Sequence, residues 1–475
     1  MHQAKKTKIV CTIGPATESE EKLAELLKAG MNVMRLNFSH GDFAEHQRKV
    51  DNLAKAVKKT GIDAAVMQDL SGPKFRIGDF KTPTVMLKEG EYITLTPEDI
   101  IGDEKRVHIN YPTLAKEIKV GRFVMVDDGK KKFEVTEIKG NDIVCRIIVG
   151  GETKGRRGVN LPGANLKIGS LTDKDKADVE FGIKNNVDIV AFSFVRRAED
   201  VIELRDILER AESKAMVLSK IETHEAIENF DSILELSDAV MVARGDLAVE
   251  IGAENVPSAQ KMIIHKANEA GKPVITATQM LESMINSPVP TRAEVSDVAN
   301  AILDGTDAIM LSEETTLGKF PVEAVKVMTR VAIKMESEEI FREVMENRKN
   351  IRRYTDDAAD AITSEAVDVA EALNATCIAA LTHTGFTAQM IARFKPTQLL
   401  MAFTPDETSY RQLLLSFGVM PVLNKRFKTL TAAVDQIKSL ALKNEFGKAG
   451  DKIVIAGGFP FEHQKDTNML LVETL

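Results

Sequence analysis

The sequence has 475 residues, of which 44% are hydrophobic and 28% charged, and its formal net charge is −8. These values predict a soluble globular protein of two or three domains. The acidic balance excludes a broad nucleic-acid-binding face, and no apolar run is long enough to cross a membrane.

The chain opens with alternating strand and helix patterns. Short apolar runs at 7–12, 32–38 and 64–69 predict three strands. Helices are expected between them, one beginning near Ser19 and one at Phe43. Gly30 and Gly61 mark the ends of these helices.

Between residues 71 and 166 the pattern changes to short alternating runs, such as 84–87, 92–96 and 124–126. Gly and Asp separate these runs, as in the turn Asp127-Asp128-Gly129. We therefore expect a β-rich domain, inserted over residues 71–166.

The α/β alternation resumes at Leu171. Apolar runs at 188–194, 215–219, 239–242, 273–276 and 307–311 predict five strands, and Thr291 with Glu294 forms a capping box that starts one of the intervening helices. Three units before the insert and five after it make a (β/α)8 barrel over residues 1–70 and 167–338. A doubly wound open sheet is the alternative, but eight regular units favour closure.

A charged, helix-patterned linker at 337–354 precedes a third region with α/β alternation. A helix is expected over about 357–373. Strands are expected near 377–381, 398–403, 420–423, 452–456 and 469–472. Residues 339–475 are therefore expected to form a separate C-terminal α/β domain.

Polar residues follow seven of the predicted barrel strands, at the end where barrel enzymes carry their active sites. So many polar groups at one rim need partners or ligands. In chain order these groups are residues 35–41, 68–76, 193–194, 220 and 222, 244–246, 276–279, and 312–314.

Four charged residues of this rim suit phosphoryl transfer. Glu222 and Asp246 are hard oxygen donors of the kind that Mg²⁺ prefers. Lys220 and Arg35 can neutralise the oxygens of a transferring phosphoryl group.

Two further features of the rim suit a small anionic substrate. The backbone N–H groups of Gly245 and Asp246 can bind a carboxylate if a helix begins there. Thr278 could relay a proton. The sequence contains no glycine-rich Gly-Lys-Ser/Thr loop, which excludes the P-loop mechanism of phosphoryl transfer.

The sequence motifs, taken in order, resemble the pyruvate kinase family over essentially the whole chain. The resemblance implies a TIM barrel with an inserted β-barrel lid and a C-terminal α/β regulatory domain, usually in a homotetramer. It implies the last step of glycolysis, the Mg²⁺-dependent (or Mn²⁺-dependent) phosphoryl transfer from phosphoenolpyruvate to ADP that gives pyruvate and ATP. The motifs are CTIGP at 11–15, MRLNFSHG at 34–41, GVNLPG at 158–163, SKIE at 219–222, MVARGDL at 241–247, TATQMLESM at 276–284 and PTRAE at 290–294.

The resemblance also implies a role for individual residues by their position in the motifs. Four groups are expected, for catalysis, for the metal, for the substrate and for the nucleotide. They are Lys220, Arg35 and Thr278 as catalytic residues; Glu222 and Asp246 as metal ligands; Arg35, Ser193, Gly245, Asp246 and Thr278 as substrate ligands; and Arg76, His40, Arg157 and Lys174 as nucleotide ligands.

Some of these residues have a plainer interpretation. His40 could cap the following helix instead of contacting a nucleotide. Arg157 stands where the family usually has lysine, so the charge is kept while the geometry changes. Ser312 and Glu314 are expected to support the site from behind, and Glu313 is expected to face solvent.

One departure from the family pattern concerns the monovalent cation. Many pyruvate kinases require K⁺, held at positions matching Asn37, Ser39, Asp69 and the carbonyl of Leu70, with glutamate at the position of Lys74. The ammonium of Lys74 is expected to replace K⁺, and residues 70, 71 and 77 also match the K⁺-independent branch. Alternatively, the first three residues simply orient Lys74 and the substrate-binding arginine.

In the C-terminal domain, residues 382–387 join a predicted strand to a helix. Family members use this loop for phosphorylated effectors, which here would meet Thr382, Thr384, Gly385 and Thr387, opposite the loop 457–468. The alternative is an ordinary helix start with Thr387 as its cap.

Two rival functions stay open from the sequence alone. One is a Mg²⁺-dependent lyase acting on phosphoenolpyruvate or an oxoacid, in which the insert and Arg76 would have no role. The other is a non-catalytic sensor of sugar phosphates, which the presence of Lys220, Glu222 and Asp246 argues against. The widely spaced cysteines and the lack of an apolar signal region predict a cytoplasmic protein without membrane or nucleic-acid partners.

Overall fold

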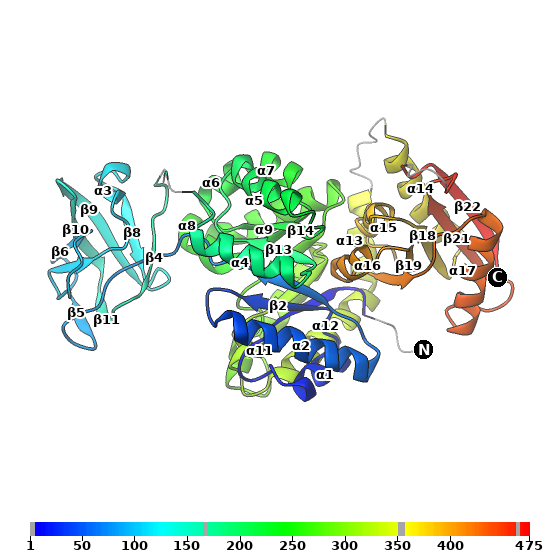
Figure 1. Cartoon of the computed structure of the whole chain (residues 1–475), viewed down its shortest axis with the longest axis horizontal. Helices are drawn as coiled ribbons and strands as arrows, with labels where there is room; N and C mark the ends of the chain where they lie inside the picture. The colour runs from blue at the N-terminus through cyan, green and yellow to red at the C-terminus, as the bar shows by residue number, and fades with distance from the viewer. Residues whose placement is uncertain (1–4, 165–166, 168, 350–356, 462–465) are drawn as a thin grey trace.

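The computed structural model describes residues 5–164, 167, 169–349, 357–461 and 466–475. Three bodies follow one another along its long axis: the β-rich insert, the barrel and the C-terminal α/β domain (Figure 1). The insert and the C-terminal domain therefore lie at opposite ends of the barrel. No helix in these ranges combines the length and apolar character that a membrane span requires.

The barrel is closed by parallel strands in the order β1-β17-β16-β15-β14-β13-β3-β2. This confirms the predicted (β/α)8 barrel, and the open-sheet alternative is wrong. The predicted strands start and end within about two residues of the observed ones, a difference typical of strand boundaries. The strands are β1 Lys8–Thr12, β2 Val33–Asn37, β3 Ala65–Asp69, β13 Ile189–Phe192, β14 Met216–Ile221, β15 Ala239–Ala243, β16 Val274–Ala277 and β17 Ala308–Leu311.

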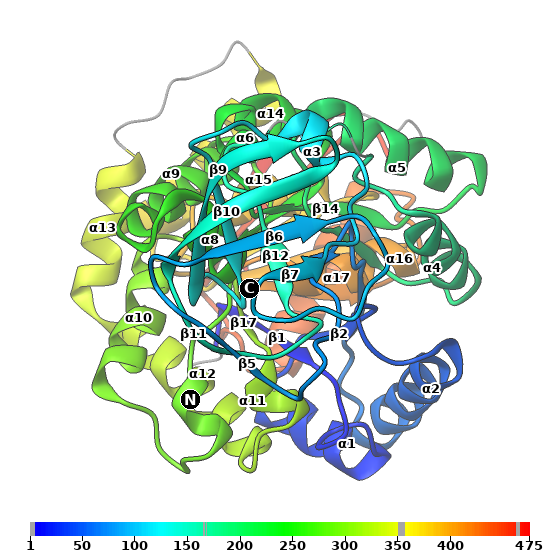
Figure 2. The same cartoon turned by 90° about the vertical axis from the view of Figure 1, so that its left-hand side faces the viewer.

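Helices surround the barrel, as the view along the long axis shows (Figure 2). Local signals start several of them: Ser19 caps α1, Asp42 caps α2, and Thr172 and Thr291 form capping boxes on α4 and α10. The helices are α1 Glu20–Ala29, α2 Phe43–Thr60, α4 Asp173–Lys184, α5 Ala198–Arg210, α6 His224–Glu228, α7 Phe230–Leu236, α8 Arg244–Ile251, η1 Ala253–Asn255, α9 Val256–Glu269, η2 Glu282–Ile285, α10 Arg292–Leu303, α11 Glu313–Thr316 and α12 Pro321–Ser337.

The insert leaves the barrel after β3 and returns before α4. Its main sheet has the order β4-β12-β8-β9-β10-β6-β7, and β11 pairs with β5. The strands enclose an apolar core of their own, which includes Val124, Phe133 and Ile143. The elements are β4 Phe75–Arg76, β5 Val85–Leu87, β6 Tyr92–Thr96, β7 Arg106–His108, α3 Leu114–Glu117, β8 Phe123–Val126, β9 Lys131–Lys139, β10 Asp142–Val149, β11 Gly151–Thr153 and β12 Gly158–Asn160.

The C-terminal domain is a sheet of order β20-β19-β18-β21-β22 between helices. Strand β22 runs antiparallel to β21, and the other pairs are parallel. Part of the predicted linker at 337–354 forms α13, and residues 350–354 lie outside the described ranges. Helix α13 Glu339–Lys349 packs on the barrel, where Phe341 and Met345 join the apolar cluster of the barrel helices. The elements of the C-terminal domain are α14 Ala358–Ala372, β18 Cys377–Leu381, α15 Phe386–Ala392, β19 Leu399–Thr404, α16 Glu407–Gln412, η3 Leu413–Leu415, β20 Val419–Leu423, α17 Leu430–Lys443, β21 Lys452–Gly457 and β22 Met469–Thr474.

The C-terminal domain closes the bottom of the barrel. Leu414 and Leu415 of η3 belong to the apolar cluster formed by the inward-facing side chains of the barrel strands. Filling a barrel end with leucine removes apolar surface from water, at about 25 cal/mol per Å². The mouth at the opposite end faces the insert.

Candidate active site

The polar mouth of the barrel follows from the two-residue repeat of its strands. In each of four strands, an inward-facing apolar residue of the barrel interior is followed two positions later by a polar residue. Since side chains two apart point to the same face, the polar residue also points inward, one layer nearer the mouth. The pairs are Val33 and Arg35, Met67 and Asp69, Ala191 and Ser193, and Leu218 and Lys220.

Lys220 lies at the centre of this mouth. Its ammonium donates to the Ser193 hydroxyl at 2.7 Å and forms ion pairs with Glu222 at 2.9 Å and Asp69 at 3.2 Å. Burial disfavours the ammonium, but the two carboxylates outweigh burial and raise the pKa of Lys220. The lysine is therefore a fixed positive charge at neutral pH.

Arg35 supplies a second fixed positive charge beside it. The Arg35 guanidinium donates to Asp69 at 2.7 Å through Nε and to the Thr12 hydroxyl at 2.8 Å through Nη1. Burial disfavours the Asp69 carboxylate, but Arg35 and Lys220 together hold the pKa of Asp69 below its usual value. One buried carboxylate thus orients both cations. Thr12 belongs to the CTIGP motif at 11–15, but that motif predicted no role for it.

Glu222 and Asp246 are the acidic pair of the mouth. The Phe194 N–H donates to Glu222 Oε2 at 2.7 Å. Burial, with a smaller contribution from Asp246, raises the pKa of Glu222, although Lys220 opposes the shift. In the described part of the chain, no group of three or more His, Cys, Asp or Glu side chains could hold a metal ion. Two carboxylates with open coordination positions fit Mg²⁺, which keeps water and substrate oxygens as ligands.

A helix does begin next to Gly245, as the carboxylate-binding prediction required. Helix α8 starts at Arg244, so the N–H groups of its first turn have no partner within the helix. The Gly245 N–H donates to the Thr278 hydroxyl at 2.9 Å, and that hydroxyl donates to the Ala277 carbonyl at 2.6 Å. Thr278 has a φ of 70°, which is costly for a β-branched residue. The structure therefore holds Thr278 in a strained position against the start of α8.

Lys74 crosses between two loops of the rim. Its ammonium donates to the Ser39 hydroxyl at 2.8 Å, and the Asn37 side chain accepts from the Ser39 N–H at 3.1 Å. Asp69 is occupied by Arg35 and Lys220, and the Leu70 carbonyl accepts from Ser193 at 2.6 Å. Of the four residues expected around a monovalent cation, Ser39 is thus the one in hydrogen-bond contact with Lys74.

Two of the four nucleotide candidates line a cleft of about 910 Å³ between the insert and the barrel. Arg76 and Arg157 line this cleft from the insert, where Arg157 lies 3.5 Å from Asp127. The pKa of His40 is lowered, first by loss of hydration at the rim and then by the positive charges of Lys74, Arg76 and Arg35. His40 does not cap α2, since Asp42 accepts from the Glu45 N–H as its N-cap; the capping interpretation of His40 is wrong.

Lys174 does not line this cleft, and its ammonium makes two hydrogen bonds to the protein. Its ammonium donates to the Phe38 carbonyl at 2.7 Å and to Asp178 at 2.6 Å. At the far side of the rim, Glu314 accepts from the Leu281 and Ser312 N–H groups, while Glu313 is exposed. Glu314 therefore supports the backbone, in the way expected from its position.

The C-terminal loop differs in detail from the expectation. Gly385, with a φ of 93°, is the N-cap of α15, so the prediction that Thr387 caps this helix is wrong. Thr387 lies inside the helix, and its hydroxyl bonds to Thr467 at 2.7 Å. The loop lines a cavity of about 340 Å³, which also receives Arg426. Residues 462–465 of the facing loop lie outside the described ranges.

Three features of the site were missed in the sequence. Thr172 and Asp175 form a capping box whose Asp175 carboxylate also accepts from the Gly72 N–H, and the spacing Thr-x-x-Asp would have revealed the cap. Arg426 follows a strand at the effector loop. Arg244, noted only as part of its motif, donates to Asp297 at 2.8 Å and to the Thr278 carbonyl at 2.6 Å, which fixes the strained threonine.

Comparisons with known proteins agree along the whole chain. The model "Pyruvate kinase, barrel domain" matches residues 4–325, and "Pyruvate kinase, alpha/beta domain" matches residues 360–473. Pyruvate kinases of Clostridium perfringens and Geobacillus stearothermophilus are both 43% identical over 99% of this chain, covering 100% and 80% of their own lengths. A crystal structure of a pyruvate kinase from Cryptosporidium parvum matches with a TM-score of 0.94 at 36% identity, covering 99% of this chain and 96% of that one.

Proposed function

The chain belongs to the pyruvate kinase family and transfers the phosphoryl group of phosphoenolpyruvate to ADP, giving pyruvate and ATP; from this premise we propose how its own residues perform the transfer. The observation that carries the proposal is the Lys220 ammonium, held between Ser193, Asp69 and Glu222 at the barrel mouth. The rival functions, a lyase without nucleotide and a non-catalytic sensor, have no support in these comparisons.

Lys220 and Arg35 bind the transferring phosphoryl group. Both cations are fixed by Asp69, so they need no rearrangement when charge spreads over the phosphoryl oxygens. Ser193 holds the Lys220 ammonium from the other side. This preorganisation favours the transition state over the ground state, which is what accelerates the reaction.

Glu222 and Asp246 are the ligands for Mg²⁺ or Mn²⁺. A divalent ion bound there supplies positive charge to the phosphoryl oxygens. Its binding would relieve the cost of a buried glutamate beside a second carboxylate, which the raised pKa of Glu222 reflects. The Phe194 N–H keeps the Glu222 side chain in place.

The start of α8 binds the substrate carboxylate. The N–H groups of Gly245 and Asp246 and the positive end of the helix favour an anion there. The Thr278 hydroxyl, 2.9 Å from the Gly245 nitrogen, lies beside that anion and is placed to pass a proton to the enolate carbon. Arg76 and Arg157, which line the cleft, bind the nucleotide phosphates, and the exposed His40 lies beside the nucleotide.

Lys74 replaces the monovalent cation. Its ammonium donates to the Ser39 hydroxyl at 2.8 Å. Burial and the charge of Lys220 lower the pKa of Lys74, while the nearby Asp246, Glu222 and Asp69 carboxylates oppose this shift. A fixed ammonium there supplies the positive field and repels a second cation. K⁺ is then not required for activity.

The test is the initial rate of pyruvate formation against KCl at constant ionic strength, with tetramethylammonium as the replacing cation. We expect the wild type to keep most of its activity without K⁺. Lys74→Glu should make the rate depend on K⁺. This dependence should be incomplete, because Leu70 and Ser71 also differ from the K⁺-requiring pattern and stay unchanged in the variant. A wild type that is nearly inactive without K⁺ would disprove the role of Lys74.

A phosphorylated metabolite binds the C-terminal cavity of about 340 Å³ and activates the enzyme. Hydroxyls of Thr382, Thr384 and Thr387 and the charge of Arg426 surround the cavity, and the Gly385 N–H closes the loop on Thr382 at 3.0 Å. Screening sugar phosphates and AMP should find one that lowers the phosphoenolpyruvate concentration for half-maximal rate, with phosphoenolpyruvate tightening effector binding equally. Hyperbolic kinetics with no response to the panel would refute this regulation.

The remaining proposals concern organisation. We place the catalytic barrel at residues 1–70 and 167–338, the lid at 71–166 and the regulatory domain at 339–475. The assembly is a homotetramer, which a mass measurement by light scattering would test. A cytoplasmic location agrees with the substrates of the reaction and with three buried free cysteines.

A further inference from the structure

The hydrogen bond between Lys74 and Ser39 joins two loops that are separate in the sequence. Ser39 lies in the loop after β2, and Lys74 lies in the loop after β3. Lysine has a flexible four-carbon chain, so it can replace a bound ion only if both loops are held in register. Helix α4, which follows the insert, contacts both loops with its first turn.

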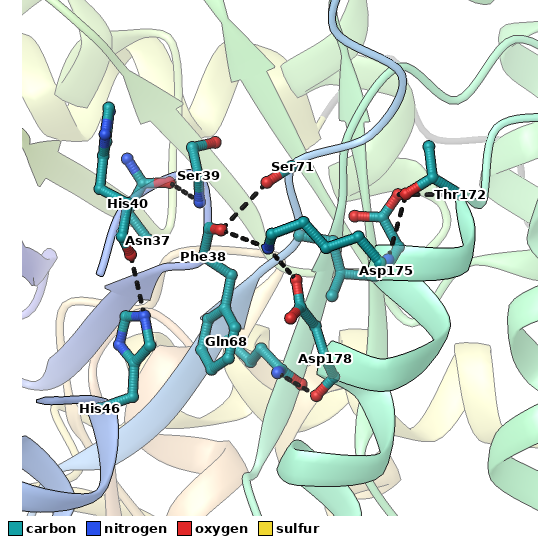
Figure 3. A network of polar contacts seen from close by, with 12 residues as sticks. Asn37, Phe38, Ser39, His40, His46, Gln68, Ser71, Thr172, Asp175 and Asp178 are labelled. Carbon is teal, nitrogen blue, oxygen red and sulfur yellow. Dashed lines mark hydrogen bonds and ion pairs between the residues drawn. The ribbon is translucent and has the colours of Figure 1, made fainter. Parts of the chain in front are cut away.

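Lys174 holds the first of these loops. Its ammonium donates to the Phe38 carbonyl at 2.7 Å, next to Ser39, and the Ser71 hydroxyl donates to the same carbonyl at 3.1 Å. Figure 3 shows Ser71 and Asp178 on either side of this point. Asp178 is buried, and Lys174 is its counterion at 2.6 Å. The buried Asp178 carboxylate therefore fixes the position of the Lys174 ammonium.

Asp175 holds the second loop. Its Oδ1 accepts from the Gly72 N–H at 3.1 Å, two residues before Lys74. Its Oδ2 accepts from the Thr172 N–H at 2.9 Å and the Thr172 hydroxyl at 2.6 Å (Figure 3). Gly72 has a φ of 62°, and a Cβ there would lie 2.9 Å from the Phe194 ring and 3.1 Å from Ser193. The turn therefore requires glycine at this position and packs closely against residues 193 and 194.

We propose that Lys174 and Asp175 are positioning residues that align the two loops, so that the Lys74 ammonium rests on Ser39 in place of a monovalent cation. The inference rests on the proposed role of Lys74. It gives Lys174 a structural task, because its ammonium donates to two protein groups, the Phe38 carbonyl and the Asp178 carboxylate. The two residues are adjacent on α4 but contact different loops. The first turn of α4 therefore links the loop after β2 to the loop after β3.

The experiment is a double-mutant cycle of Lys174→Met with Lys74→Met, measured as kcat without K⁺. Lys174→Met should lower kcat by about 10- to 100-fold, since misplacing a catalytic charge by an ångström has effects of that size. In the Lys74→Met background, the same change should have almost no further effect. The KM for ADP should stay within about twofold of the wild type in both backgrounds.

Two further variants separate positioning from folding. Lys176→Met is the matched control: Lys176 lies on the same helix and pairs with Glu203 at 3.1 Å, away from both loops. It should keep wild-type kcat. Lys174→Met with Asp178→Asn removes the buried charge along with its counterion, so it should restore the melting temperature but not kcat.

Three results would overturn the inference. Equal losses from Lys174→Met in both backgrounds would show that it does not act through Lys74. A raised KM for ADP with unchanged kcat would assign Lys174 to the nucleotide. A wild type that requires K⁺ would remove the role of Lys74 and this inference with it, whereas an additive cycle in a K⁺-independent wild type would overturn the inference alone.

Discussion

The two ends of the barrel carry similar buried charges but satisfy them differently. At the bottom, Asp307 forms an ion pair with Lys395 at 2.8 Å and accepts hydrogen bonds from the Phe417 and Val274 N–H groups at 3.0 and 3.1 Å. Asp188 accepts from Arg411 at 2.7 Å and from the Val66 N–H at 2.8 Å. Every one of these carboxylate oxygens has a partner within the protein.

The mouth leaves part of its charge for a ligand. The Asp246 carboxylate accepts no hydrogen bond from the described residues, although it lies close enough to Glu222 to raise its pKa. Glu222 has the Lys220 ammonium as its counterion at 2.9 Å, so the unsatisfied charge is that of Asp246, and a carboxylate beside a second carboxylate is costly to hold. The comparison teaches that buried charge alone does not mark an active site. What marks it is charge that the protein does not itself satisfy.

The largest effect should come from the cation at the centre of the mouth. Lys220→Met removes a charge that acts mainly in the transition state, so kcat should fall by at least about 10³-fold while phosphoenolpyruvate binding changes little. Steady-state kinetics and a binding titration would measure both. An unchanged turnover number would remove Lys220 from the mechanism. It would also contradict the view that buried charge at the mouth serves catalysis while buried charge at the bottom serves stability.

The bottom of the barrel should respond in stability instead of activity. Lys395→Met leaves Asp307 buried without its cation, and breaking such a pair costs about 3–5 kcal/mol. The melting temperature should fall, while kcat per folded molecule at 25 °C should stay within about twofold. Lys395→Met with Asp307→Asn should be less destabilised than the sum of the single changes. If the single change abolished catalysis without a loss of stability, the bottom would not be purely structural.

The acidic pair of the mouth should respond to the metal. Glu222→Gln and Asp246→Asn should each raise the Mg²⁺ concentration for half-maximal rate by at least about 10-fold, because a hard dication depends on ligand charge. Glu250→Gln is a matched control, since Glu250 lies on α8 with Asp246 and lines the same cleft. Mg²⁺ titrations that overlay the wild type for both variants would place the metal elsewhere.

The smallest effect concerns a neutral side chain behind the mouth. His46 is stacked on Phe38 with a centroid distance of 4.0 Å, and burial lowers its pKa from 6.5 to about 4. Its contribution to stability is therefore present above pH 6.5 and is lost as the pH falls toward 4, because the unfolded state then binds about one more proton. The melting temperature of His46→Phe should fall less over this range than that of the wild type. Parallel curves for the two proteins would contradict the neutral, buried histidine.

Much of the fold could be read from local pattern. The apolar runs predicted each barrel strand, Thr291 with Glu294 predicted the start of α10, and Gly61 predicted the end of α2. These signals work because caps and alternating burial depend on residues close in the chain. The charged groups at strand ends also indicated the mouth, since parallel strands of a barrel bring their ends to one rim.

Contacts between distant segments were decided by the tertiary structure. Lys74 could meet Ser39 only after β2 and β3 paired. The contact of α4 with the loop after β2 depends on where the chain returns from the insert. The sequence by itself determined which residues could serve as cations, carboxylates and caps. Barrel closure decided which of them share a partner, because burial and distance arise only when strands far apart in the chain are packed together.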